Sequence, residues 1–279
     1  MSEFEACRAE IAALQRTLTQ VKDILLQDAN GRFLAAHPNP LNRFGRKSFS
    51  QSDEDGITIE ILRRLGLTPG SYTGTFAEFG VGNGLENNTL LLGSLGWRGF
   101  WVGGQDLAFD PAPLPRLDYF QEWITRENVT SLAQSGLAAL GVAAVDLVSL
   151  DLDGNDIHIA ETLLSAGILP KVFIAEYNAK FPPPTRFQIA YDPEHRWQGD
   201  DYFGAALQNF IDLFKRFGYA LVCCNGHSGA NAFFVRQEFI HRFGDVPTDP
   251  RDIHVPPRYH LPTAYGHRPS ARVAEALFS

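Results

Sequence analysis

The chain has 279 residues, of which 44% are hydrophobic and 20% are charged. This composition excludes wholesale disorder and allows one large globular domain with an appendage. The formal net charge of −8 provides no overall positive field for nucleic acid or an anionic membrane, so we expect neither as a partner. No apolar stretch approaches the roughly 20 residues of a membrane span. The cysteines Cys7, Cys223 and Cys224 form neither a metal-binding spacing nor a disulfide framework, and no leader-like N-terminus precedes them, which favours a cytoplasmic protein.

A repeat of apolar positions predicts a first helix over residues 1–27. Steps of three and four residues alternate along this stretch and define a heptad seam over about three repeats. The seam favours a short coiled coil through which the chain self-associates. A single amphipathic helix packed on the main domain is the alternative interpretation. The apolar positions are Phe4, Cys7, Ile11, Leu14, Leu18, Val21 and Leu25.

A polar, proline-containing stretch over residues 28–50 is predicted to be a linker or lid. Residues 51–245 then form the main domain, and residues 246–279, rich in Pro, His and Arg, form a C-terminal extension. Strand-like and helix-like segments alternate in the main domain. Their order predicts the α/β class, a doubly wound and mainly parallel sheet with helices on both faces, preceded by the amphipathic or coiled-coil helix. The expected strands are 76–79, 99–102, 145–152, 172–175 and an antiparallel hairpin of 220–224 with 232–235; the expected helices are 55–65, 85–95, 157–164 and 202–217, and residues 119–126 are helix or strand.

A glycine-rich turn after the first strand is the most informative motif. In Thr75-Phe-Ala-Glu78-Phe-Gly80-Val-Gly82-Asn-Gly84, three glycines stand two residues apart behind a short apolar run. Such a turn lets backbone N–H groups approach a ligand at the head of the next helix. The spacing therefore predicts a nucleotide-like cofactor. A purely structural turn between strand and helix is the alternative.

Acidic side chains follow several of the predicted strands. In an open α/β sheet, ligands bind outside the carboxyl ends of the strands. Asp151 and Asp153 follow one strand, and Glu176 and Asn178 follow the next, so we expect three carboxylates and an amide in one crevice. A shared proton or a hard divalent cation would offset the repulsion, and an oxygen-only ligand set favours Mg²⁺, Mn²⁺ or Ca²⁺ over zinc. For Asp156 the alternative role is an Asx-type turn that caps the following helix.

Further motifs are spread over residues 48–238. They are Phe49-Ser50-Gln51 with Asp55-Gly56, the glycine turn from Glu78 to Gly84, Glu127-Asn128, Ser149-Leu-Asp151-Leu-Asp153-Gly154-Asn155-Asp156, Glu176-Tyr177-Asn178, Trp197-x-Gly199-x-Asp201-Tyr202-x-Gly204 and Asn231-Ala-Phe-Phe-Val235. Together they resemble the class I S-adenosylmethionine (SAM)-dependent methyltransferases. Within that class they are most similar to bacterial O-methyltransferases that accompany polysaccharide or secondary-metabolite genes. The resemblance implies a Rossmann-like fold and SAM as cofactor.

The resemblance also implies roles for individual residues. The segment Asp146-Leu-Val-Ser-Leu-Asp151 is similar to the fourth-strand region of metal-dependent O-methyltransferases, which implies Asp151, Glu176 and Asn178 as metal ligands. In those families the pair after strand five is contiguous, whereas Tyr177 intervenes here. The implied cofactor-binding residues are Gln51, Glu78, Gly80, Gly82, Gly84, Gln105, Asp106, Glu127, Asn128 and Asp151, with Asp106 or Gln105 on the ribose and Glu127 and Asn128 near the adenine.

The predicted reaction is SAM-dependent methylation of a hydroxyl on a sugar or glycan, assisted by Mg²⁺ or Mn²⁺; the preference for a sugar follows from the resemblance alone. Because the methyl donor is already activated, the protein has to position the reactants and help remove the hydroxyl proton. A metal-independent N- or C-methyltransferase of a small metabolite and a non-catalytic assembly module are the alternatives. The candidate bases are Asp153, Asp156, His158, His195 and His227.

Overall fold

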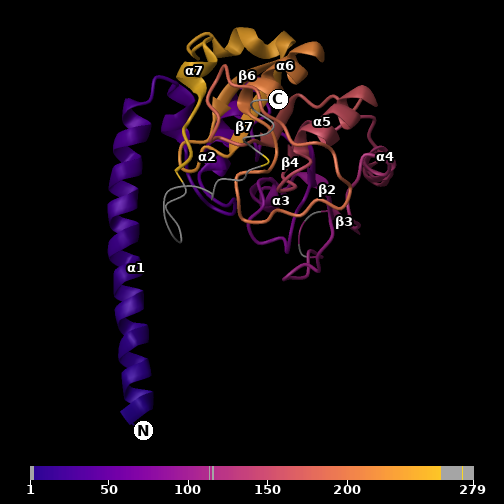
Figure 1. The fold of residues 1–279 in the computed structure, drawn as a ribbon. Helices are drawn as coiled ribbons and strands as arrows, with labels where there is room; N and C mark the ends of the chain where they lie inside the picture. The colour runs from indigo at the N-terminus through magenta and orange to yellow at the C-terminus, as the bar shows by residue number, and fades with distance from the viewer. Residues whose placement is uncertain (1–2, 113, 115, 259–271, 273–279) are drawn as a thin grey trace. The chain divides into compact units, whose positions relative to one another are not determined.

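A computed structural model describes residues 3–112, 114, 116–258 and 272 of the chain. It divides into two compact units, Met1–His37 and Pro38–Ser279. The first unit is one helix, α1 (Glu3–Ala36), drawn in indigo in Figure 1. Residues 28–36, which the sequence assigned to the linker, are therefore helical. No helix among the described residues is both long and apolar enough to cross a membrane.

The second unit is built on a seven-stranded sheet with the order β3-β2-β1-β4-β5-β7-β6. Strands β1 to β5 run parallel, and β7 is antiparallel to both of its neighbours. This arrangement confirms the predicted α/β class and the predicted hairpin at the edge. The strands are β1 (Thr75–Phe79), β2 (Arg98–Gly103), β3 (Leu117–Gln121), β4 (Leu147–Leu150), β5 (Val172–Glu176), β6 (Tyr219–Cys224) and β7 (Asn231–Arg236).

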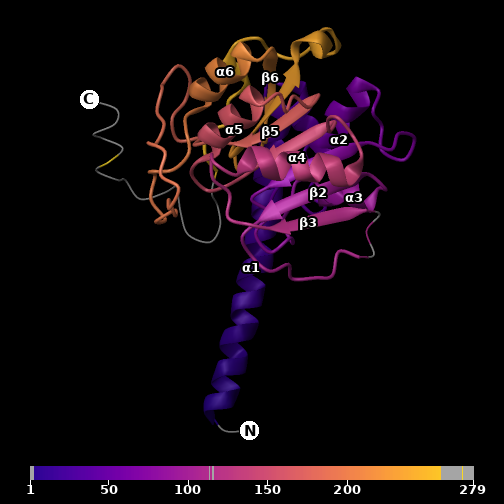
Figure 2. The ribbon, with the colours of Figure 1, turned by 90° about the vertical axis from the view of Figure 1, so that its right-hand side faces the viewer.

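Helices cover both faces of the sheet (Figures 1 and 2). Helices α4, α5 and α6 contact one another in succession and form one layer, with α4 and α5 in front of the strands in Figure 2. Helices α2 and α3 lie on the opposite face. The helices of this unit are α2 (Glu54–Leu65), α3 (Leu90–Ser94), α4 (Val129–Leu140), α5 (Asp156–Ser165), α6 (Leu207–Arg216) and α7 (Pro250–Ile253), with 3₁₀ helices η1 (Pro40–Phe44) and η2 (Gln237–Phe243).

The central strands form the core of this unit. Every residue of β1 and of β4 is buried, as expected for parallel strands that are covered on both faces. Phe79 of β1 meets Phe100 of β2 edge to face, with ring centroids 5.9 Å apart. Because both faces of the sheet are covered, a ligand reaches these strands only at the loops that follow their carboxyl ends.

Several elements differ from the expected ones. Residues 85–95 were expected to form one helix, but only Leu90–Ser94 is helical, because the glycine turn and its following loop take up the preceding residues. Helix α4 was not predicted, and residues 119–126 begin as strand β3, which ends at Gln121. Helix α6 begins only at Leu207, since Ala205 pairs with Gln188 in an isolated β-bridge. Most of the predicted C-terminal extension, residues 259–271 and 273–279, lies outside the described residues.

Candidate active site

The glycine turn follows β1 and packs against the backbone that follows β4. Gly80 has a φ of +93° and Gly82 a φ of +53°, a region that side chains other than glycine rarely adopt. A Cβ at Gly80 would lie 1.7 Å from the main-chain oxygen of Asp151, whereas a Cβ at Gly82 would meet nothing within 4 Å. Gly80 is therefore required by the close approach of the backbone after β4, and Gly82 leaves open space beside the turn.

Glu78, near the end of β1, fixes the loop that follows the turn. Its carboxylate accepts hydrogen bonds from the N–H groups of Asn88 at 2.9 Å and Thr89 at 3.0 Å, and from the Thr89 hydroxyl at 2.5 Å. Burial raises the pKa of Glu78, and these donors offset part of the rise. Both carboxylate oxygens are thus engaged in holding the loop at the start of α3.

A cavity of about 450 Å³ lies at the carboxyl ends of strands β1 to β4. Its volume is within the range of small-molecule sites. One wall carries the half-exposed indole of Trp123, and the glycine turn contributes Gly80 and Gly82. The lining residues are Gly80, Gly82, Gly103, Gly104, Gln105, Glu122, Trp123, Ile124, Asp151, Leu152, Asp153, Asn155, His195, Arg196 and Trp197.

Of the two residues expected at the ribose, only Gln105 lines this cavity. Asp106 instead accepts a hydrogen bond from the side-chain amide of Gln121 at 3.0 Å. Gly84 lines neither this cavity nor its neighbour, because it packs beside Leu107, whose side chain a Cβ would approach to 3.0 Å. Besides Asp151 and Asp153, Glu122 is an acid that lines the cavity, and it stands directly after β3.

Glu127 and Asn128, expected near an adenine, lie outside the cavity. Because β3 ends at Gln121, residues 122–124 line the cavity in their place. The amide of Asn128 bridges its own loop, accepting from the N–H of Thr125 at 2.8 Å and donating to the main-chain oxygen of Trp123 at 2.7 Å. Glu127 accepts the hydroxyl hydrogen bond of a tyrosine in the segment after β5. These two residues therefore shape the loop, and the sequence offered no signal that β3 is so short.

A second cavity of about 290 Å³ adjoins the first. The two share Gly80, Gly82, Gln105, Asp151 and Asp153, so they meet at the acidic end of β4. None of the described residues that line the second cavity is Lys, Arg or His. They are Gln51, Glu78, Gly80, Val81, Gly82, Asn83, Glu86, Asn87, Asn88, Gln105, Asp151, Asp153 and Asn231.

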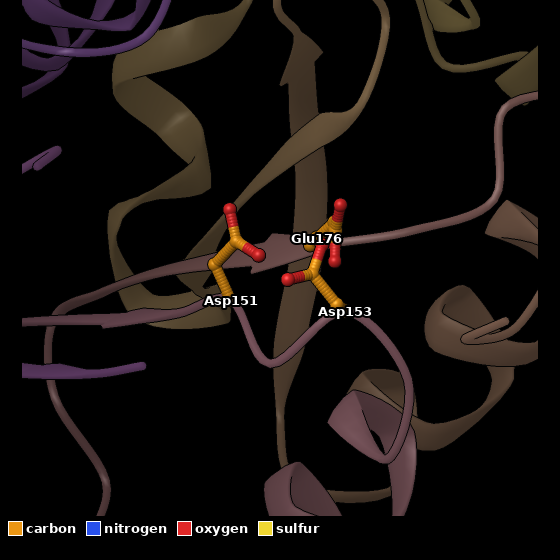
Figure 3. A group of neighbouring side chains, drawn as sticks. All are labelled: Asp151, Asp153 and Glu176. Carbon is orange, nitrogen blue, oxygen red and sulfur yellow. The ribbon is translucent and has the colours of Figure 1, made fainter. Parts of the chain in front are cut away.

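Three carboxylates gather where the cavities meet. Asp151, Asp153 and Glu176 each offer an oxygen atom, and these atoms lie within 4.8 Å of one another (Figure 3). Burial, with the charges of Asp153 and Asp156, raises the pKa of Asp151 to about 8. Burial and the charge of Asp151 raise the pKa of Glu176 well above its usual range, and burial also raises that of Asp153. Keeping all three carboxylates ionised in this buried site costs free energy, because the charges repel one another and lose hydration. A bound cation or shared protons would lower that cost.

The side chain of Asn178, also expected as a metal ligand, makes hydrogen bonds to the segment after β5. Its buried amide donates to the main-chain oxygens of Asp201 at 3.0 Å and Phe203 at 3.2 Å. Its side-chain oxygen accepts from the N–H of Lys180 at 3.2 Å. The three carboxylates that converge are Asp151, Asp153 and Glu176, and the side chain of Asn178 holds the segment after β5 in place.

Two of the candidate bases make hydrogen bonds to the main chain of the surrounding loops. The carboxylate of Asp156 accepts from the N–H groups of Leu152 at 2.7 Å and Gly154 at 2.9 Å, which is the turn-forming alternative considered for this residue. Burial raises the pKa of Asp156 to about 7. The ring Nε2 of His158 lies 2.9 Å from the main-chain oxygen of Ile189, and His158 lines neither cavity.

The two remaining candidate bases, His195 and His227, differ in whether they line a cavity. His227 lines neither cavity, and its main-chain N–H donates to Asp53 at 2.9 Å. His195 lines the larger cavity, and its Nε2 is buried without a well-formed hydrogen bond among the described residues. Burial lowers the pKa of His195. His195 packs on Gly154, where a Cβ would come within 2.2 Å of the imidazole.

The segment after β5 closes one side of the larger cavity. The indole N–H of Trp123 donates to the main-chain oxygen of Pro193 at 2.9 Å, and the Arg196 guanidinium lies over the Trp123 ring at 4.6 Å from its centroid. The side-chain amide of Asn155 donates to the main-chain oxygen of Asp192 at 2.8 Å. These contacts tie the segment to the loops after β3 and β4.

Asn231 is a site residue for which the sequence analysis predicted no role. It begins β7, opposite Glu176 of β5, and lines the smaller cavity. Its buried amide donates to Glu54 at 3.1 Å, and its side-chain oxygen has no hydrogen-bond partner among the described residues. The motif that contains Asn231 was visible in the sequence, but its position beside Glu176 depends on the antiparallel pairing of distant strands.

No protein-family model matches the chain, and no curated protein matches it. Among solved structures, CalO1, a methyltransferase in calicheamicin biosynthesis with S-adenosylhomocysteine (SAH) bound, is 16% identical with a TM-score of 0.34 over 65% of this chain and 54% of that one. The methyltransferase MycE from the mycinamycin pathway, in complex with Mg, SAH and mycinamycin VI, is 10% identical with a TM-score of 0.34 over 80% and 52%. An O-methyltransferase family protein from Burkholderia thailandensis is 12% identical with a TM-score of 0.37 over 77% and 70%. The chain spans about half the length of the first structures it matches, and the likeness concerns the fold alone.

Proposed function

We propose that the chain is a SAM-dependent methyltransferase. The observation that carries this proposal is the meeting of two cavities at Asp151 and Asp153, beside a glycine turn with open space at Gly82. Group transfer between two bound molecules needs each to be held separately with the reacting atoms brought together at one point. The resemblance of the turn to that of class I methyltransferases supports SAM as the donor.

The larger cavity offers the groups that such a donor needs. Trp123 and Ile124 provide apolar surface for a purine ring, and the indole of Trp123 is half exposed beside the guanidinium of Arg196. Gln105 and Glu122 lie at the ends of neighbouring strands and offer acceptors for ribose hydroxyls. Gly82 lets the ligand approach the backbone without a side chain in the way. When bound, SAM supplies a methyl group already activated by its sulfonium.

The carboxylate cluster fits a divalent cation. Asp151, Asp153 and Glu176 are close enough to share one ion, and the Oε2 atom of Glu176 is buried without a hydrogen-bond partner among the described residues. An oxygen-only set of this kind suits Mg²⁺ or Mn²⁺. When bound there, the ion would supply Lewis-acid stabilisation to an acceptor oxygen.

The acceptor that fits the smaller cavity is a neutral, hydroxyl-rich molecule, in line with a sugar or glycan hydroxyl. The described lining residues include amides and carboxylates but no cationic side chain, so the cavity disfavours an acidic acceptor. The unpartnered side-chain oxygen of Asn231 is suited to accept a hydrogen bond from a hydroxyl. Of the candidate bases, Asp153 lines both cavities and His195 lines the larger one, so these two are the candidates that remain near the point where the cavities meet to take the hydroxyl proton.

The first test is calorimetric titration of the full chain with SAM and with SAH, once with Mg²⁺ and once with EDTA. Micromolar binding in both conditions is expected, because the larger cavity is formed without help from the cation. Absence of SAM and SAH binding in both conditions would refute the cofactor assignment and favour the non-catalytic assembly module.

The second test separates the metal from the cofactor. Asp153→Asn should abolish Mn²⁺ binding, measured by electron paramagnetic resonance, while leaving SAH affinity within about threefold. Glu161→Gln is the matched control, since Glu161 is a carboxylate of α5 that pairs with Arg216 and lines neither cavity.

Transfer of labelled methyl from SAM to neutral methyl glycosides, but not to the matching uronic acids, is the expected acceptor preference. Transfer that persists after exhaustive chelation would favour the metal-independent alternative.

A further inference from the structure

Helix α1 carries a row of exposed apolar side chains. Six of its large apolar residues are between 49% and 75% exposed. Every one of them falls on the heptad seam. Such a row on a solvent-facing helix marks an interaction surface. The six are Phe4, Ile11, Leu14, Leu18, Val21 and Leu25, and Cys7, also exposed, occupies the remaining seam position.

The shape of the row favours a matching helix as its partner. A helix that packs on a globular domain shows a broad apolar face, whereas two positions per heptad define the narrow seam of a coiled coil. None of the described α-helices in the second unit exposes a large apolar side chain; its exposed apolar residues lie in loops and η1. A second copy of α1 offers the complementary seam.

We propose that two copies of the chain pair through α1 in a parallel, in-register coiled coil. Parallel pairing sets each of the seven seam positions against itself. In an antiparallel pair, a positions face d positions, so Phe4 or Leu25 at one end of the seam would lack an apolar partner. Among the described flanking residues, parallel pairing also sets Glu10 at a g position near Gln15 at an e position, with no like charges opposed.

The buried area is adequate for such a pair. Burying an aliphatic or aromatic side chain removes roughly 60–120 Å² of apolar surface, as the usual transfer free energies imply. With the exposed fractions above, the twelve large apolar side chains of the two seams would bury roughly 450–900 Å². A standard interface of about 1,600 Å² contains roughly 900 Å² of apolar surface, so the seam is of comparable size.

Cys7 provides a direct test of register. In the proposed pair it faces Cys7 of the second copy, within reach of a disulfide. Diamide, which takes up the two protons and two electrons of the thiols, should cross-link the native chain to a dimer on a non-reducing gel. Cys223 and Cys224 are buried and should not react. The double variant Cys7→Ser with Ala9→Cys moves the thiol to the outer face, and it should give no cross-link. Equal cross-linking of both proteins, or of neither, would overturn the parallel register.

Light scattering after size exclusion tests the pairing itself without any ligand. The native chain should have twice the 30.9 kDa chain mass. Leu14→Glu should shift it to the monomer, whereas Ala13→Glu, which adds the same charge one residue away on the exposed face, should not. A monomeric native chain would overturn the proposal and favour packing of the apolar row on the second unit of the same chain. A larger assembly would also overturn the proposal. SAH affinity, measured on the same samples, should be unchanged by Leu14→Glu, so this proposal and the methyltransferase proposal can fail separately.

Discussion

Two glycines in one turn should respond in opposite ways to the same added methyl group. Gly80→Ala would place a Cβ 1.7 Å from the main-chain oxygen of Asp151, and Gly82→Ala would place one in open space at the junction of the cavities. We expect the first change to damage folding and the second to damage ligand binding. The pair therefore separates a structural glycine from a ligand-facing one within three residues.

The magnitudes follow from the geometry. Both changes put a side chain in the left-handed region, which costs about 1–2 kcal/mol. Gly80→Ala adds overpacking against backbone, about 1–3 kcal/mol more, for a total of roughly 2–5 kcal/mol. For a domain of this size, 1 kcal/mol corresponds to about 2–4 °C in melting temperature. We therefore expect a fall of about 4–20 °C for Gly80→Ala and of about 2–8 °C for Gly82→Ala.

The assay combines a thermal melt with calorimetric titration of SAH. Gly82→Ala should remain folded but bind SAH at least about tenfold more weakly, a change of about 1.4 kcal/mol. Native SAH affinity in Gly82→Ala would refute the placement of the cofactor on this turn. A melting temperature for Gly80→Ala equal to that of the native chain would refute the inferred contact with the end of β4.

Three further outcomes are expected. In EDTA the melting temperature should fall from about pH 5 to pH 8. The pKa of Asp151 in the folded chain, about 8, lies above its unfolded value, so the stability that its protonated form contributes is lost as the pH rises towards 8. Glu176→Gln should reduce this fall, and a flat profile of the native chain would contradict the reasoning. Asn178→Ala should cost about 2–4 kcal/mol in a denaturant titration by stranding two buried carbonyls, yet leave Mn²⁺ affinity unchanged; a loss of Mn²⁺ affinity would restore Asn178 to the ligand set. Trp123→Ala should weaken SAH binding about tenfold with little change in melting temperature, since its indole is half exposed; unchanged SAH affinity would exclude stacking on this residue.

Features that depend on neighbouring residues were predictable from the sequence. The glycine turn follows β1 as expected, and Asp151 and Glu176 lie together because parallel strands end at one edge of the sheet. The hairpin of β6 and β7 was also predictable, since its two apolar runs are close in the chain.

Features that depend on distant contacts were not predictable. Asn178 was expected as a ligand because it stands two residues after Glu176 and because the resemblance implied it. Its hydrogen-bond partners, the main-chain oxygens of Asp201 and Phe203, come from a segment whose path no local pattern indicates. Glu127 and Asn128 were placed near the adenine because the early end of β3 left no mark on composition. Helix α1 continues beyond residue 27 because polar residues and a single glycine weaken a helix without ending it.

The contact between Gly80 and the backbone of Asp151 makes the turn and the carboxylate cluster one mechanical unit. The N–H of Asp151 also donates to the main-chain oxygen of Phe79 at 3.0 Å, so the residue is fastened to β1 on the other side of the turn. If a bound nucleoside displaces the turn, the side chain that would hold the ion is therefore displaced with it. Thermodynamic reciprocity then requires that the ion tighten or loosen the hold on the nucleoside by the same factor as the nucleoside does for the ion.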